Sequence, residues 1–369
     1  MSAGRVAPYD LGRQGARMQG ASIRLLTTDD PDWDEWLRRT EHDVYHRAAY
    51  HRLAEEQGEG RAFLAVYGSS ARFLAWPYLL RDISSSERHA GRTDVTSVYG
   101  YAGPVTSSAA GDRRFTRRAW AAICSGWRRQ GAISAFARFH PLLANQHLLA
   151  DDPGVVELGP TVSIDLTIPE EPNVQLYPRV LRQEIAAARR RGLQTARDPS
   201  WERLPDFVSL YQLAMRRIGA ADRYLYPTGY FERLRDELGE RAHLFLTTLS
   251  DSTAAAGIFL EHDGMLHAHL TGTDPELRGL SPLKVLLDDV RGWGHRRGSR
   301  LLHLGGGRGG LADSLLEFKG RFSPRRHSFA VGRWILDEPA YRRLCAERWQ
   351  AARLAGSVWD PDFFPAYRA

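Results

Sequence analysis

Cysteine, lysine and long apolar segments are scarce in this chain of 369 residues. Its two cysteines, Cys124 and Cys345, can form one disulfide bond at most, which excludes a disulfide framework and a four-thiolate zinc site. No apolar run approaches the ~20 residues that a membrane-spanning helix needs. The start of the chain also lacks the charged and apolar segments of a secretory signal. We therefore expect a soluble, cytoplasmic protein with no membrane span, in which both cysteines are core thiols.

Lysine is nearly absent, because only Lys284 and Lys319 are lysines among 50 Lys and Arg residues. A lysine ammonium is compact and strongly hydrated, and a planar guanidinium does not reproduce its geometry. Both lysines are therefore candidates for a functional site, the alternative being that two residues escaped a general drift to arginine. The net charge of +6 and the pI of about 9.4 favour polyanionic partners, such as nucleic acid or phosphate-bearing cofactors.

The length of the chain exceeds what one hydrophobic core usually supports, so two domains are expected. Strand-like and helical periodicities alternate in both halves, and a strand, helix, strand order occurs in each. A break rich in proline and glutamate at residues 168–172 marks the expected seam. We predict a mixed α/β fold of two lobes, with a flexible tail at residues 1–22, a first lobe at 23–166, a second lobe at 167–336, and a segment at 337–369 that returns to the first lobe.

The periodicities also predict individual elements. Helices are expected at residues 32–39, 114–130, 177–191, 204–218, 230–238 and 282–297, with a short one at 313–319. Strands are expected at residues 61–67, 71–80, 95–101, 133–139, 243–249, 255–261, 265–271 and 300–304.

The start of the helix predicted at 282–297 has the features of an anion site. Ser281 is the expected N-cap and Pro282 occupies the first turn. Lys284 opposes the helix dipole there, so an anion must offset it, either Asp288 one turn later or a bound phosphate. Arg278 just ahead adds a second cation to the free amides of the helix start.

A glycine run, Gly305-Gly306-Gly307-Arg308-Gly309-Gly310, follows the strand predicted at 300–304. It satisfies G-x-G-x-x-G, but no acidic residue stands about 20 residues further on and no second strand–helix unit follows, which argues against a dinucleotide site. It also lacks the Gly-Lys-Ser/Thr of a P-loop. Backbone without Cβ atoms allows a bulky substrate to lie against the main chain, as a long acyl donor would.

The short helix predicted at 313–319 carries Phe318 and Lys319. Acyl transfer to an amine passes through a tetrahedral intermediate whose oxyanion needs a fixed positive donor, and a positioned ammonium supplies one. Lys319 is thus the candidate catalytic cation, unless it is a simple surface lysine, and Phe318 would shape the pocket. Asp94 and Glu317 are the only candidates for a general base, because the acceptor amine can arrive already deprotonated.

Other sites are less well supported. The helix predicted at 177–191 carries four arginines that either form a solvated face or follow a phosphate backbone: Arg182, Arg189, Arg190 and Arg191. His267 and His269 share one face of a strand, but no third ligand stands at a recognisable spacing, so we expect core or cleft histidines and no metal. No G-x-S-x-G motif is present, and neither cysteine lies in a nucleophile motif.

Four ordered motifs resemble the Fem-type branch of the GNAT acyltransferase superfamily. They are His267-Ala268-His269-Leu270-Thr271-Gly272-Thr273, Arg278-Gly279-Leu280-Ser281-Pro282, His303-Leu304-Gly305-Gly306-Gly307, and Asp313-Ser314-Leu315 with Phe318-Lys319. Supporting pieces are Asp43-Val44-Tyr45-His46, Tyr99-Gly100-Tyr101-Ala102-Gly103-Pro104 and Arg138-Phe139-His140-Pro141. The resemblance covers nearly all of the chain after residue 40.

This resemblance implies two tandem GNAT-like lobes. It also implies the transfer of an aminoacyl group from aminoacyl-tRNA to the amine of a small-molecule or peptide-like acceptor, without a cofactor, in natural-product or peptidoglycan-precursor biosynthesis. The Phe-Lys pair of the family, which lies against donor and acceptor, falls on Phe318 and Lys319. The segment Arg278-Gly279-Leu280-Ser281 lacks the spacing of a coenzyme A site, which favours the tRNA donor.

The expected site residues follow from these motifs. Donor contacts are assigned to Lys284, Arg278, Gly305, Gly306, Gly307, Arg308, Arg182, Arg189, Arg190 and Arg191. Acceptor contacts are assigned to Tyr45, His46, Tyr99, Tyr101, Arg217, Tyr224, His269 and Thr271. The lysine and Gln-Ser pattern with which bridge-forming enzymes hold a nucleotide-linked muropeptide is replaced here by Tyr45-His46-Arg47, which favours a small metabolite or antibiotic intermediate over a cell-wall precursor as the acceptor. The alternatives are an acyl-CoA-dependent N-acyltransferase and a non-catalytic RNA-binding protein on the same scaffold. A monomer or a loose dimer is expected.

Overall fold

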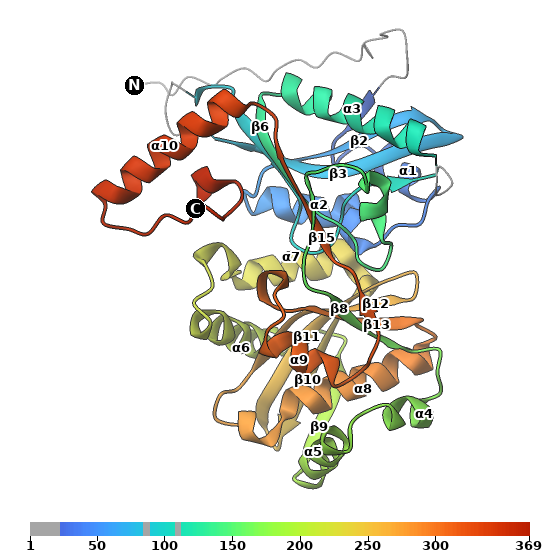
Figure 1. Cartoon of the computed structure of the whole chain (residues 1–369). Helices are drawn as coiled ribbons and strands as arrows, with labels where there is room; N and C mark the ends of the chain where they lie inside the picture. The colour runs from blue at the N-terminus through green and yellow to red at the C-terminus, as the bar shows by residue number, and fades with distance from the viewer. Residues whose placement is uncertain (1–22, 84–88, 108–111) are drawn as a thin grey trace.

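Two mixed sheets, each covered by helices, form the two lobes of the protein (Figure 1). The computed structural model describes residues 23–83, 89–107 and 112–369, and the tail expected at residues 1–22 lies outside them. The prediction of a mixed α/β fold with two lobes is confirmed. In the described part of the chain, no helix combines the length and the apolar character needed to cross a membrane.

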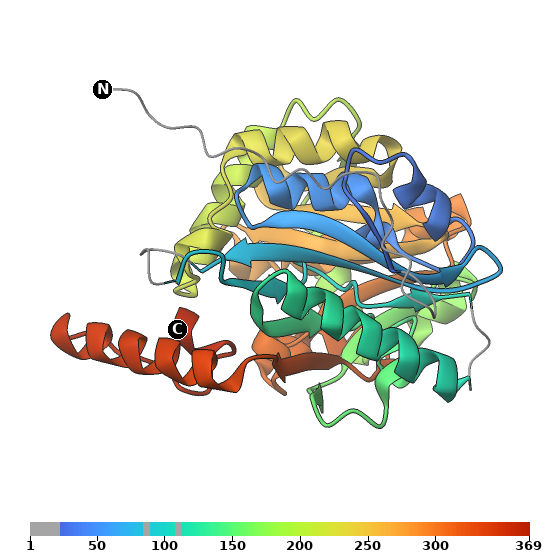
Figure 2. The same ribbon diagram turned by 90° about the horizontal axis from the view of Figure 1, so that it is seen from above.

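The first sheet has the strand order β1-β2-β3-β4-β6-β15-β7, and β5 pairs with β3. The strands are β1 (Ile23–Leu26), β2 (Arg61–Ser69), β3 (Arg72–Asp82), β4 (Thr93–Thr96), β5 (Val105–Thr106), β6 (Ala132–Arg138), β7 (Val155–Glu157) and β15 (Ala330–Ile335). Helix α3 (Arg113–Arg129) covers one face, and α1 (Asp32–Leu37) and α2 (Ala48–Glu56) cover the other (Figure 2). Leu64 of β2 therefore joins one core and Ala65 the other, which explains why β2 is apolar at nearly every position.

The second sheet has the strand order β14-β8-β13-β12-β11-β10-β9. The strands are β8 (Thr161–Asp165), β9 (Leu193–Asp198), β10 (Ala242–Leu249), β11 (Ser252–His262), β12 (Met265–Thr273), β13 (Leu301–Gly306) and β14 (Arg326–His327). Helices α5 (Arg179–Arg190) and α8 (Pro282–Arg297) pack on one face, and α6 (Leu204–Arg217) and α7 (Thr228–Leu238) on the other. Strands β12 and β13 are parallel, with α8 as their crossover helix.

Shorter helices connect these elements. They are α4 (Glu170–Gln175), α9 (Ser314–Gly320) and the 3-10 turns η1 (Val44–His46), η3 (Asn145–Leu149), η4 (Asp222–Tyr224), η5 (Gly239–Arg241), η6 (Arg278–Leu280), η7 (Arg308–Gly310) and η8 (Ala366–Arg368). Helix α10 (Glu338–Leu354) follows β15 and projects outward from one side of the first lobe (Figure 2).

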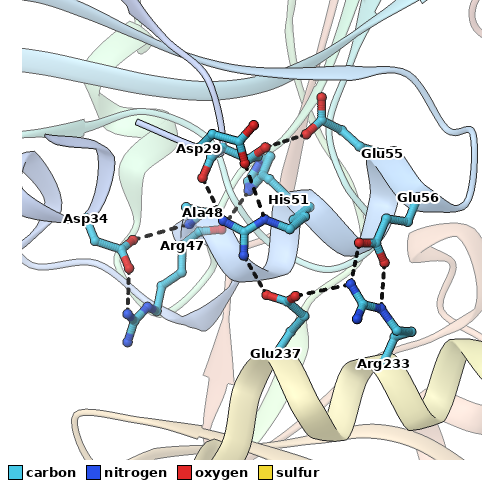
Figure 3. A network of polar contacts seen from close by, with 11 residues as sticks. Asp29, Asp34, Arg47, Ala48, His51, Glu55, Glu56, Arg233 and Glu237 are labelled. Carbon is cyan, nitrogen blue, oxygen red and sulfur yellow. Dashed lines mark hydrogen bonds and ion pairs between the residues drawn. The ribbon is translucent and has the colours of Figure 1, made fainter. Parts of the chain in front are cut away.

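A single apolar core joins the two lobes. It contains Leu53 of α2, Phe207 of α6 and Phe231 of α7, together with residues from both sheets. Polar contacts border it where α2 faces α7: Arg52 pairs with Glu237 at 2.7 Å, and Arg233 donates to Glu56 at 2.8 Å (Figure 3). Partly exposed pairs of this kind contribute at most about 1 kcal/mol each, so the apolar core dominates the association of the lobes.

Two strands belong to a different lobe from the one expected. Strand β8, which lies within residues 23–166, pairs with β13 in the second sheet, and β15, which lies within residues 167–336, pairs with β6 in the first. The chain therefore enters the second sheet before the break at residues 168–172 and leaves it before residue 336. Each lobe thus contains a strand from beyond the expected boundary, which ties the two sheets together. Residues after β15 lie against the first sheet, where Tyr367 Oη contacts Ser134 Oγ at 2.7 Å.

Two local expectations also need correction. Ser281 precedes α8 in a left-handed conformation and makes no side-chain cap, although Pro282 does start the helix. The strand expected at 95–101 ends at Thr96, and Tyr99 and Tyr101 lie in the loop that follows β4. This loop places both tyrosines at the junction of the lobes.

Candidate functional site

Lys319 lies near the C-terminal end of α9, a helix fixed at both its start and its buried face. Asp313 caps the helix by accepting hydrogen bonds from the amides of Leu315 (3.1 Å) and Leu316 (3.0 Å). Phe318 packs on Phe322 in the second-lobe core, with ring centroids 5.6 Å apart. The Lys319 ammonium is half-buried and donates a 2.7 Å hydrogen bond to the carbonyl of Gly306. The short helix thus holds a cation against the glycine run.

Gly305 is the point at which the two lobes meet beside this ammonium. A Cβ atom on Gly305 would lie 3.3 Å from Lys319 Nζ of the second lobe and 3.3 Å from Tyr101 Oη of the first. The backbone of Gly305 has φ +76°, which favours glycine, and a larger side chain would fill the position between the two polar groups. Gly305 therefore keeps a buried stretch of main chain, free of any side chain, between an ammonium and a phenol.

Burial tunes the acidity of both groups. It lowers the pKa of Lys319 to about 8, a shift that the carboxylate of Asp313 partly opposes. It raises the pKa of Tyr101. At neutral pH the lysine is therefore mostly charged and the tyrosine neutral, so both can donate a hydrogen bond to an oxyanion.

A cluster of buried histidines surrounds Asp43 on the inner side of Tyr101. Asp43 Oδ2 lies 2.6 Å from His140 Nε2 and 2.6 Å from His267 Nε2, and all three side chains are at most 2% exposed. His267 Nδ1 lies 3.2 Å from His303 Nδ1. Burial alone would raise the pKa of Asp43, but His267 and His140 outweigh it, so this pKa lies well below its usual range. Asp43 is thus a buried carboxylate anion held by histidines of both lobes.

The same atoms are close enough to share a cation, since the ligand atoms of Asp43, His140 and His267 lie within 4.8 Å of one another. The hydrogen bonds of His140 argue against this use. Its Nδ1 accepts from the amide of Leu143 at 3.2 Å, so its Nε2 carries the proton that is donated to Asp43. Nε2 then has no lone pair for a metal, and the cluster is better described as a hydrogen-bond network.

Aromatic side chains extend from Tyr101 along the junction of the lobes. Tyr45 Oη lies 3.3 Å from His269 Nδ1, and the ring of His269 lies 5.5 Å from that of Tyr99. The ring of Tyr224 follows at 6.0 Å from Tyr99. His269 is the extra residue of a β-bulge in β12, because Ile258 pairs with Leu270 and Phe259 with Ala268. The bulge turns this histidine toward the tyrosines.

Comparison with known proteins identifies the fold. Residues 178–319, which end at Lys319, match the family model "Acetyltransferase (GNAT) domain". FemX superposes with a TM-score of 0.64 at 13% identity, over 87% of this chain and 98% of that chain. The chain has a Fem-type GNAT fold. L-PGS from Bacillus licheniformis gives a TM-score of 0.54 at 12% identity, over 87% of this chain and 95% of its own.

A third similar structure is the C-terminal domain of a protein described as a lysylphosphatidylglycerol synthetase from Agrobacterium fabrum. It gives a TM-score of 0.51 at 16% identity and covers 81% of this chain and 92% of its own. No curated protein sequence matches the chain significantly. The match of residues 178–319 assigns an acyltransferase (GNAT) domain to the second lobe. The similar structures establish the fold of both lobes.

The Fem-type GNAT fold brings together a subset of the predicted residues. Lys319, Gly305, Gly306 and Tyr101 converge, and Tyr45, Tyr99, Tyr224 and His269 form the adjoining aromatic group. Gly307 serves the turn, since a Cβ there would lie 2.0 Å from the carbonyl oxygen of Leu311. Thr271 is half-buried two residues beyond His269, and the contact of Phe318 with a donor stays a prediction.

Asp94 is not placed to act as a general base. Its carboxylate is wholly buried and accepts hydrogen bonds from Arg81 Nε (2.6 Å), Arg368 Nε (2.5 Å) and Tyr367 Oη (3.1 Å). This corrects the prediction, because a carboxylate engaged by three donors has no free position for a substrate proton. Glu317 is exposed on α9, and side chains two residues apart on a helix point in different directions, so it does not approach Lys319.

Most of the expected donor cations already have partners. Lys284 pairs with Glu184 at 2.7 Å, and Asp288, its expected partner, instead accepts from Arg291 at 2.9 Å. The remaining contacts are Arg189 with Asp288 (2.8 Å) and Asp289 (2.5 Å), Arg182 with Gln175 (2.6 Å), and Arg308 with Asp313 (3.0 Å). Arg190, Arg191 and Arg278 are exposed and form no ion pair with another described residue. Among the expected donor residues, only Arg190, Arg191 and Arg278 can therefore bind a polyanion without first losing an ion pair or side-chain hydrogen bond to another described residue.

Two expected acceptor residues lie elsewhere. His46 is wholly buried, and its Nδ1 accepts a 3.0 Å hydrogen bond from the amide of Asp43, so it supports the loop and does not face an acceptor. Arg217 lines a hollow of about 320 Å³ with Leu213 and Thr273, and none of the acceptor tyrosines borders that hollow.

Sequence reasoning missed Asp43, His140 and His303 as a group. Each stands in a motif that carries the family resemblance, but they are 36 to 224 residues from their partners (267 − 43 = 224 for Asp43 and His267), and no local spacing connects them.

Proposed function

We propose that this protein is an aminoacyltransferase that moves an aminoacyl group from aminoacyl-tRNA to the amine of a small or peptide-like acceptor. The observation that carries the proposal is the meeting of Lys319 and Tyr101 over Gly305, at the junction of the lobes. An ester carbonyl placed there would take over the hydrogen bond that Lys319 now gives to Gly306. The charge that develops on the carbonyl oxygen during attack would then face a fixed ammonium in a water-poor setting.

The acceptor side of the proposal rests on the aromatic group next to Tyr101. Tyr45, Tyr99, Tyr224 and His269 are contributed by both lobes and continue directly from the position of the donor carbonyl. Aromatic side chains of this type bind the apolar body of a ligand and orient its polar end. An amine held along them would approach the carbonyl from the side opposite α9.

The choice of an aminoacyl-tRNA donor is supported by what the start of α8 offers. In coenzyme A-dependent members of the superfamily this helix start binds the pyrophosphate, but here Lys284 is paired with Glu184 and Ser281 has a left-handed backbone. Exposed Arg190, Arg191 and Arg278 offer contacts for phosphates of an RNA backbone. One similar structure bears a name that describes joining lysine to a lipid, which is also an aminoacyl transfer.

An acyl-CoA-dependent N-acyltransferase is the second candidate, because the matching family model carries an acetyltransferase name. A donor assay separates the two. We expect the purified chain to consume radiolabelled aminoacyl-tRNA and form a labelled amide when a mixture of small amines is supplied, and to leave acetyl-CoA intact under the same conditions. Release of free coenzyme A with no loss of aminoacyl-tRNA would contradict the proposal and establish the second candidate.

A further inference from the structure

We propose that Asp43, His267 and His303 form a proton relay across the junction of the lobes, in which His303 Nε2 takes the proton of the attacking amine. The inference rests on the proposed function, which supplies the amine and the ester but names no base. It also gives a role in the chemistry to these three buried polar side chains, which the packing of the core does not require. Asp43 and His267 act through His303, so they are positioning residues and His303 is the catalytic one.

The relay consists of two close polar contacts followed by a contact between two rings. Asp43 is in the first lobe, and its Oδ2 lies 2.6 Å from Nε2 of His267 on β12. His267 Nδ1 lies 3.2 Å from Nδ1 of His303, on the neighbouring strand β13. The aromatic ring of His303 lies 5.1 Å from that of Tyr101, whose hydroxyl lies beside Gly305 and Lys319. The line therefore runs from a buried carboxylate to the position proposed for the reacting carbonyl.

The proposed relay has one direction. His267 is neutral in it and keeps its proton on Nε2, which lies 2.6 Å from the ionised Asp43, so Nδ1 of His267 carries the lone pair. His303 must then donate through Nδ1, which leaves the lone pair of His303 on Nε2. That nitrogen is buried and has no hydrogen-bond partner in the part of the chain that the structure describes. An orphaned acceptor in a buried network points to a partner that arrives with the substrate.

The surroundings of His303 keep this lone pair free. Burial lowers the pKa of His303 well below its usual range, and nearby His267, His140, His327 and Lys319 lower it further. The side chain is therefore neutral at physiological pH. Protonation is transient and is supported through His267 by the Asp43 anion, which His140 holds in place from the other side.

The reaction sequence balances. The amine nitrogen attacks the ester carbonyl to form the C–N bond, and its proton passes to His303 Nε2 while the negative charge on the carbonyl oxygen faces Lys319. The carbonyl then re-forms, the C–O bond to the ribose breaks, and His303 returns the same proton to the leaving ribose oxygen. The products are an amide and a tRNA with a free hydroxyl group, so no other reactant is consumed.

The direction of the relay can be measured on the unliganded full-length protein. In histidine-labelled protein, long-range proton–nitrogen correlation spectra report which ring nitrogen carries the proton. We expect His303 to be protonated at Nδ1 alone and His267 at Nε2, with assignments made from His303→Gln and His267→Gln. A proton on Nε2 of His303 would overturn the relay, because no lone pair would then face the substrate.

The catalytic role is tested with two amines of similar size and different basicity, ethylamine and methoxyamine, as acceptors from charged tRNA. At neutral pH ethylamine is an ammonium ion and methoxyamine is already a free base. Each amine nitrogen must lose a proton as it attacks the carbonyl, so His303→Gln should lower transfer to both amines by about 10²-fold, and added imidazole should restore part of the rate lost in His303→Ala. His327→Gln is the matched control, a nearby histidine bonded to Ser163 and outside the relay.

A loss in His303→Ala that added imidazole does not reduce would mean a structural role for His303 and would overturn the proposal, as would full activity of His303→Gln. The thermal midpoints of the variants verify that the fold is retained. If the wild-type protein forms no amide from charged tRNA with any amine, the proposed function is wrong. The tautomers measured on the same protein still decide whether the relay exists.

Discussion

Replacement of Lys319 with methionine is expected to lower the rate of acyl transfer by about 10² to 10³-fold, because it removes the donor that faces the developing oxyanion. Methionine has a similar length and fills the same half-buried position without charge. Lys319→Arg should not restore activity, since the planar guanidinium is too large for the position that the ammonium occupies beside Gly305 and Gly306. Initial rates with saturating donor measure the effect on kcat, which should fall much more than KM rises.

The other lysine provides the matched control for this experiment. Lys284→Met removes an ammonium on α8 that is largely buried, paired with Glu184 and not in contact with Gly305 or Lys319, so kcat should stay within about twofold. Equal activity of the wild-type protein and Lys319→Met would remove Lys319 from the mechanism. Equal losses in the two lysine variants would instead point to a general effect of positive charge on donor binding.

The lowered pKa of Lys319 gives this prediction two further readouts. With an acceptor that is already neutral, wild-type activity should fall as the pH rises through about 8, where the ammonium loses its proton. Between about pH 8 and the ordinary pKa of lysine the unfolded chain binds more protons than the folded one, so stability rises with pH over that window. Below it the folded state carries the cost of a buried charge. Lys319→Met should therefore be at least as stable as the wild-type protein at neutral pH while being inactive.

Replacement of Asp94 with alanine is expected to lower the free energy of unfolding by about 3–5 kcal/mol, the range typical of breaking a buried ion pair. The substitution leaves Arg81, Arg368 and Tyr367 without their common acceptor. Because two of these residues belong to η8, we also expect the C-terminal segment to detach. Urea denaturation measures the first effect, and limited proteolysis within residues 338–369 measures the second.

Asp151→Ala is the control for this stability prediction. Asp151 is an exposed partner of Arg113 and Arg117, so its loss should leave the denaturation midpoint nearly unchanged. Asp94→Ala should keep its activity per folded molecule, since Asp94 anchors the C-terminus and does not take part in the chemistry. An unchanged midpoint for Asp94→Ala would show that this network does not hold the C-terminal segment.

The features that the sequence predicted well depend on local rules. The helix expected at 282–297 has the same bounds as α8, because apolar periodicity, Pro282 at its start and Gly298 after its end are all local signals. Lys319 was singled out by its rarity and by the glycine run, and the structure places both at the junction of the lobes. These signals do not need any knowledge of distant partners.

The features that the sequence did not predict depend on distant partners. Strands β8 and β15 are short, and their apolar pattern is the same whichever sheet they join, so only the pairing with β13 and β6 assigns them. Asp94 is a candidate base on the sequence alone, because its contacts with Arg81 on the neighbouring strand and with Arg368 of the C-terminal segment form only in the folded chain. The network around Asp43 likewise unites four separate segments, and no spacing rule relates them.

The position of a bound donor tests the central claim most directly. A stable analogue, 3′-aminoacylamino-adenosine, replaces the ester of the tRNA end with an amide and can be located in a crystal of the complex. We expect its carbonyl oxygen within hydrogen-bond distance of Lys319 Nζ, about 2.7–3.2 Å, over Gly305 and beside Tyr101. An analogue bound elsewhere, with Lys319 still bonded to Gly306 and no contact between them, would contradict the account.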